Sequence, residues 1–140
     1  MNKPLILILT LLVCACQSGQ QKAEDGTISL DSLKSEVLFI HDEVMPKMGE
    51  LRRVRKDLML QADSLIAADS VAAKRIDSLA NNLANASEGM MQWMRAYEPD
   101  FEGTEEEKRA YFEAQKVSIQ KVKEEMERSL SEGSQAIGKE

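Results

Sequence analysis

The segment HDEVMPKM, residues 41–48, brings together side chains that can bind a soft metal ion. His41, Met45 and Met48 follow one another at spacings of four and three residues, so a helix presents them on one face. Met90 and Met94 lie one helical turn apart in a second apolar stretch. Thioether and imidazole groups suit Cu(I), and a Met/His pair can ligate haem iron in a helical bundle. These five residues are therefore a candidate metal site.

The same residues also fit an apolar core. Methionine is flexible and fills irregular space, and Pro46 creates such space because it kinks a helix against the carbonyl of Asp42. The chain has one histidine and lacks the repeated Met-x-x-Met and Cys-x-x-Cys-His patterns of dedicated copper and haem proteins. We favour core packing, keep a Cu(I) site as the alternative, give haem less weight, and expect no cofactor.

Catalysis has little support in the residue types. Nucleophilic catalysis needs an activated side chain beside a base, and a zinc site needs several protein ligands. The chain offers one histidine, two cysteines that both lie within the first 16 residues, and no glycine-rich phosphate loop. We therefore expect no catalytic activity.

A basic cluster stands in this otherwise acidic chain, formed by Arg52, Arg53, Arg55 and Lys56. Spread over two helical turns, these side chains can face anionic lipid head groups or an acidic partner. The alternative is a set of exposed ion pairs with glutamates of neighbouring helices, each of which contributes little to stability. We favour the ion-pair interpretation.

An Asp-Ser-apolar pattern occurs in residues 31–33, 63–65, 69–71 and 77–79. It resembles the acceptor sequence of the general protein O-glycosylation system of the Bacteroidota, which implies that the serine hydroxyl carries a glycan. The alternative is helix-start chemistry, which fits Asp69-Ser70 well and Asp77-Ser78 poorly. The candidate acceptors are Ser32, Ser64, Ser70 and Ser78.

The N-terminus has the pattern of a secretion signal. Lys3 precedes an apolar run from Leu5 to Val13, far shorter than the roughly 20 residues of a membrane-spanning helix. Residues 13–16, Val-Cys-Ala-Cys, resemble the lipobox of bacterial lipoproteins: an apolar residue, two small ones, and the cysteine that is lipidated after cleavage. Cys16 fits better than Cys14, because Cys14 follows the bulky Val13.

The lipobox resemblance implies that residues 1–15 are a cleaved signal peptide and that Cys16 carries several acyl chains. One buried chain anchors a protein marginally, whereas two or more anchor it durably. Residues 16–28 are polar and without apolar periodicity, so they predict a flexible tether. The expected location is the bacterial cell envelope, with the lipid in the outer membrane and the domain facing the periplasm.

Composition and charge restrict the class of the remaining domain. The net charge of −6 argues against nucleic acid as a partner. Glycine, proline and aromatic residues are few among the 140 residues, while Ala, Leu, Met, Glu and Lys abound. This amino-acid composition is typical of one small helical domain.

Apolar periodicity predicts an all-α fold over residues 29–140. Apolar residues recur at spacings of three and four in three stretches, a coiled-coil-like heptad pattern that only Lys47 and Gln61 interrupt in the first stretch. Asp69 offers a cap for the second helix, and Thr104 with Glu107 forms a capping box for the third. We predict an elongated up-down-up bundle with helices over residues 29–67, 70–97 and 105–137.

This hairpin geometry brings the two halves of the candidate metal site together. If the first turn lies near residue 69, positions whose numbers add to about 138 lie side by side. The expected pairs are Met48 with Met90, Met45 with Trp93, and His41 with Tyr97.

The whole chain resembles small lipoproteins of the Bacteroidota that carry similar HDEVMPKM segments, a resemblance that brings no activity with it. We predict a lipid-anchored envelope protein with a structural or protein-interaction role, through an envelope partner or self-association. The alternative hypothesis is a metal-binding helical lipoprotein that uses the His/Met cluster.

Overall fold

The computed structural model describes residues 28–138, which are all-helical and contain no strand. The elements are α1 (Leu30–Val44), the short 3-10 helix η1 (Met45–Lys47), α2 (Met48–Leu65), α3 (Ser70–Ala96) and α4 (Glu105–Ala136). The predicted helical class is confirmed, and the expected ranges end within two residues of these elements. The predicted signal peptide, Cys16 and nearly all of the predicted tether lie outside the described residues.

α1, α3 and α4 each begin at a side chain that caps free backbone N–H groups, whereas α2 follows η1 without a side-chain cap. The Ser29 hydroxyl accepts from the backbone N–H of Ser32, and Asp69 accepts from two N–H groups of α3. The predicted capping box of α4 is confirmed, because Thr104 and Glu107 each accept from the other's backbone N–H. Because these polar residues satisfy the first turns, they set where the helices start.

At Pro46, where the sequence predicts a kink, the backbone forms the 3-10 helix η1 between α1 and α2. The N–H of Met45 still donates to the carbonyl of His41, closing α1, and the following residues form η1 before α2 begins. A proline has no N–H to donate, so the α-helical bonding pattern cannot pass through it unchanged. Segment 30–65 is therefore one helical path with a kink.

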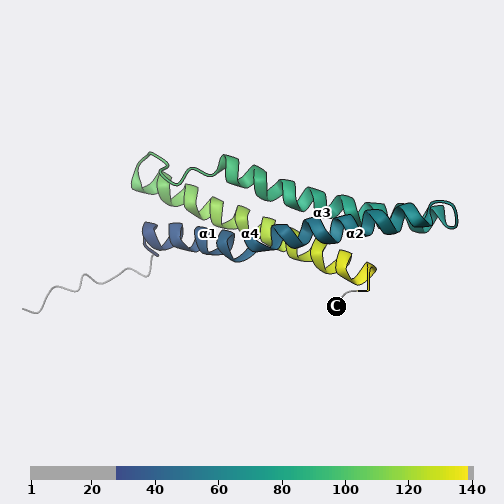
Figure 1. The fold of residues 1–140 in the computed structure, drawn as a ribbon. Coiled ribbons are helices and arrows are strands. Elements are labelled where there is room, and N and C mark those ends of the chain that lie inside the picture. Colours follow the sequence, from purple (N-terminus) through teal and green to yellow (C-terminus); the bar gives the residue numbers. More distant parts are fainter. Residues whose placement is uncertain (1–27, 139–140) are drawn as a thin grey trace, which may run out of the picture.

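The helices form an elongated rod (Figure 1). α2 packs along α3, while α4 packs against α1, α2 and α3. The α2–α3 turn lies at one end of the rod, and the start of α1 lies with the α3–α4 connection at the other (Figure 1). With 32 residues, α4 alone is about 48 Å long.

Ion pairs fix the direction of α1 relative to α4. Three lysine–glutamate pairs join this kinked first path to α4, and the partners of every pair are 80 residues apart. A constant offset means that α1 and α4 run in the same direction. The pairs are Glu36–Lys116, Glu43–Lys123 and Lys47–Glu127.

The apolar stripes meet in one core that runs along the rod. Small alanines of α3 face larger side chains of the other helices, which allows close packing without voids. Within residues 28–138, the buried residues lie between positions 33 and 133, so a fragment that begins after Cys16 keeps all of them. The core residues are Val37, Val44, Leu51, Val54, Leu58, Ala80, Leu83, Ala86, Met90, Trp93, Ile119 and Met126.

Candidate metal site, acceptor serines and basic surface

His41 belongs to a row of stacked rings between α1 and the end of α3. Its ring centroid lies 5.6 Å from that of Trp93, and the Trp93 and Tyr97 centroids lie 4.8 Å apart. The structure thus stacks His41 on Trp93, which the predicted pairing placed beside Met45, and Trp93 in turn stacks on Tyr97. Its Nδ1 lies 2.8 Å from Oδ1 of Asp42, an exposed neighbour in α1.

Stacking rather than hydrogen bonding holds the inner part of this row. The Nε1 of Trp93 and the hydroxyl of Tyr97 are buried and have no hydrogen-bond partner among the described residues. Burial raises the pKa of Tyr97, and the nearby Tyr111 and Asp100 add to this effect because they disfavour a phenolate. These surroundings therefore favour the neutral form of the Tyr97 side chain.

The candidate sulfur ligands lie in different environments. Met90 is completely buried in the core, whereas Met45 and Met48 are half-buried and pack against it. Met94 is 39 % exposed on the outside of α3. Within residues 28–138, no group of three or more His, Cys, Asp or Glu side chains is arranged to hold a metal ion. Three of the four methionines thus take part in core packing, and Cu(I) binding stays a prediction.

The four candidate acceptor serines all lie on helices and are exposed to solvent. The hydroxyls of Ser64 and Ser78 donate to backbone carbonyls of the preceding turn. Ser70 follows Asp69, which caps α3, so helix-start chemistry accounts for that copy of the pattern. Exposure leaves each hydroxyl accessible, and glycosylation of Ser32, Ser64, Ser70 or Ser78 stays a prediction.

The basic cluster lies on the side of α2 that faces away from the core. All four side chains are exposed, and Arg53 forms an ion pair with Glu50 of its own helix at 3.4 Å. Arg52, Arg55 and Lys56 form no ion pair within the described part of the chain. This differs from our expectation of pairs with neighbouring helices, because the cluster lies opposite the face that packs on α3 and α4.

Open grooves lie elsewhere along the rod. One of them, of about 630 Å³, lies between α2, α3 and the end of α4. There the side-chain oxygen of Gln61, one of the two polar interruptions of the first stripe, is buried without a hydrogen-bond partner in the described residues. The other interruption, Lys47, is paired with Glu127.

Sequence reasoning missed one exposed aromatic residue. Phe39 is 69 % exposed on α1, beside an open groove of about 350 Å³ that Ser32, Ser35, Glu36 and Ile40 also line. Its position off the apolar stripe was the available signal, because the stripe residues Val37 and Ile40 place Phe39 on another face of the helix.

Comparisons with protein-family models, curated proteins and solved structures found no match to this chain. None of the described helices is both long enough and apolar enough to cross a membrane. The functional proposal accordingly depends on the chain's own residues and their geometry.

Proposed function

We propose that this chain is a lipid-anchored protein of the bacterial cell envelope, with a structural or protein-interaction role and no catalytic activity. The lipobox-like residues 13–16 support lipidation at Cys16, and the polar tether supports a domain held off the membrane. The proposed location of the lipid anchor is the outer membrane, with the helical domain facing the periplasm.

The proposed architecture is an up-down-up three-helix bundle. The three ion pairs to α4 have the same sequence offset, which supports a parallel arrangement of α4 and the first helical path. The four-residue turn between α2 and α3 supports an antiparallel neighbour. A rod of this kind can hold a partner at a distance from its anchor, which suits a structural or interaction role.

The main support for an interaction role is the exposed side chain of Phe39. A phenylalanine side chain buries roughly 150–250 Å² when it is covered, and aromatic residues often dominate interface energetics. At Phe39 most of this area faces solvent, next to a groove that is open along α1. Leu38, also exposed on α1, adds apolar area nearby. The chemistry that fits is an apolar side chain of an envelope protein or of a second copy of this chain.

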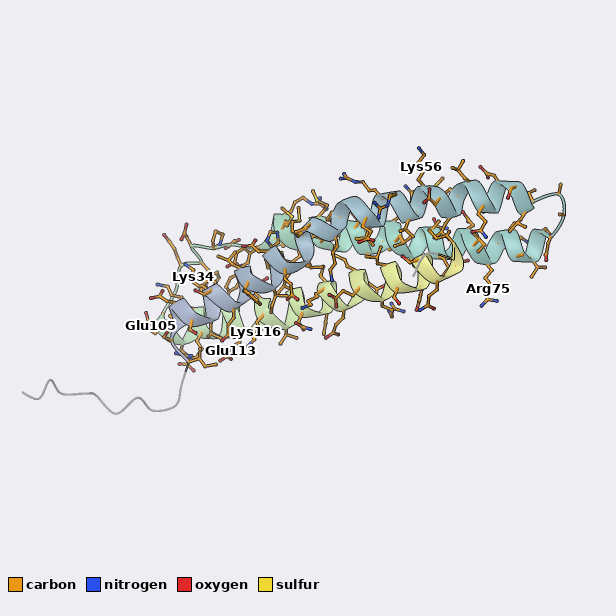
Figure 2. All side chains as sticks on the ribbon, turned by 60° about the horizontal axis from the view of Figure 1, so that its bottom comes forward. Lys34, Lys56, Arg75, Glu105, Glu113 and Lys116 are labelled. Carbon is orange, nitrogen blue, oxygen red and sulfur yellow. The ribbon has the colours of Figure 1, made fainter. Side chains whose placement is uncertain are left out.

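A photo-crosslinking amino acid placed at residue 39 tests the interaction role in intact envelopes. The matched control position is Glu113, which is exposed on α4 near the same end of the rod (Figure 2). We expect one discrete crosslinked species from position 39 and none from position 113. Its mass distinguishes a partner protein from a second copy of this chain. Crosslinks of equal pattern from both positions, or none from position 39, would contradict the proposal.

A further inference from the structure

We propose that the outer face of α2 binds the surface of an anionic phospholipid bilayer. This face contains the basic cluster and, toward the α2–α3 turn, three exposed apolar side chains, the last of which directly follows α2. Its residues are Arg52, Arg53, Arg55, Lys56, Met59, Leu60 and Ile66. The inference concerns the folded domain itself and does not depend on the proposed lipid anchor.

Three of the four cations of this face are available to an external anion, whereas Arg53 is paired with Glu50. The lysines that join the first helical path to α4, Lys47, Lys116 and Lys123, are each paired with a glutamate. In contrast, Arg52 and Lys56 have no acidic partner among residues 28–138. Lys56 points away from α3 and α4 (Figure 2). Unpaired, exposed cations in a chain of negative net charge favour an anionic partner.

Apolar side chains continue the same face toward the α2–α3 turn. Leu60 is 60 % exposed and Ile66, directly after α2, is 62 % exposed. Four of these residues follow the helical repeat and lie in one line on the surface: Arg52, Lys56, Met59 and Ile66. Along this line the two cations come first and the two apolar side chains follow. Asp63 is the acidic residue on this line. Cations that bind phosphate, combined with apolar groups that enter the head-group layer, are typical of helices at a bilayer surface.

The shape of the face favours a bilayer over an acidic protein. None of the four basic residues lines either of the two grooves described above. They lie exposed on the outer side of a single helix. A bilayer supplies many phosphates on a surface and needs no shaped pocket.

Vesicle binding by the non-acylated fragment 17–140, which keeps the core, tests this proposal. We expect co-sedimentation with vesicles of phosphatidylglycerol and phosphatidylcholine in equal parts, weakening as salt is added, and no binding to phosphatidylcholine alone. The Arg52→Gln/Lys56→Gln variant should bind about 30-fold more weakly, the ratio for about 1 kcal/mol at each side chain. The matched Lys108→Gln/Lys121→Gln variant should bind like the wild type, because those lysines lie on α4.

A second pair of variants tests the apolar part of the face. Leu60→Ser/Ile66→Ser should weaken binding to the mixed vesicles, whereas Val117→Ser, an exposed apolar position on α4, should not. Circular dichroism checks that every variant keeps its helicity. The absence of vesicle binding, equal losses in the α2 and α4 variants, or binding to polyglutamate without binding to vesicles would overturn the proposal.

Discussion

Gly133 lies where α4 packs closely against both α2 and α3, and replacing it tests this packing directly. A Cβ atom at this position would lie 2.9 Å from Cγ1 of Val54 and 3.0 Å from Cδ1 of Leu83. Both neighbours are buried, so neither can move into solvent. Overpacking of this kind costs about 1–3 kcal/mol, while alanine gains about 1 kcal/mol over glycine in a helix. Gly133→Ala should therefore lower the free energy of unfolding, by up to about 2 kcal/mol.

Gly89 provides the matched control in the interior of α3. No heavy atom outside its own helical surroundings lies within 4 Å of a Cβ built there. Gly89→Ala should therefore raise the free energy of unfolding by about 0.5–1 kcal/mol, through helix propensity alone. Urea unfolding of fragment 17–140, followed by circular dichroism and Trp93 fluorescence, measures both changes provided that the m-values agree.

The opposite signs of the two glycine substitutions are the decisive result. If Gly133→Ala stabilised the fragment as much as Gly89→Ala, α4 would not approach α2 and α3 as closely as the structure has it. A loss of several kcal/mol in both variants would also refute the reasoning, because an alanine at position 89 meets no neighbouring side chain.

Three further predictions concern charge, metal and modification. The hydrogen bond from Lys123 lowers the pKa of Glu43 below 4.5, so the stability that this pair contributes is present above that pH and is lost as pH falls through the lowered pKa. Acid unfolding of Glu43→Gln, whose side chain does not titrate, should accordingly depend less on pH in this range than that of the wild type. If the methionines only pack, fragment 17–140 should not compete with a micromolar chelator for Cu(I); if it binds one equivalent, His41→Ala should abolish binding with little loss of helicity. If the Asp-Ser-apolar pattern is read, protein from the native host should be heavier by sugar masses, and an unmodified intact mass would exclude glycans on Ser32, Ser64, Ser70 and Ser78.

The helices could be predicted because their signals are local. Heptad spacing, the proline at position 46 and the capping box of Thr104 and Glu107 lie within a few residues of the features they determine. The caps of α1 and α3, Ser29 and Asp69, are equally short-range, although the sequence pattern predicts only Asp69. Local signals of this kind do not depend on how the helices pack.

The contacts between helices could not be predicted, because they depend on register and rotation. Heptad spacing alone does not pair Glu36 with Lys116, and it does not show that Gly133 touches Val54. The basic cluster is the clearest example. Many glutamates are available in the sequence, but the rotation of α2 turns Arg52 and Lys56 away from them.

Acyl labelling with membrane fractionation in the native host tests the proposed lipid anchor most directly. Wild type and Cys14→Ser should both incorporate a fatty-acid label and sediment with membranes. Cys16→Ser should incorporate none, and the chain should be released from the membrane fraction or remain as an uncleaved precursor. Labelling that persists in Cys16→Ser and disappears in Cys14→Ser would contradict the assignment, and a wild-type chain without label would contradict the lipid-anchored function itself.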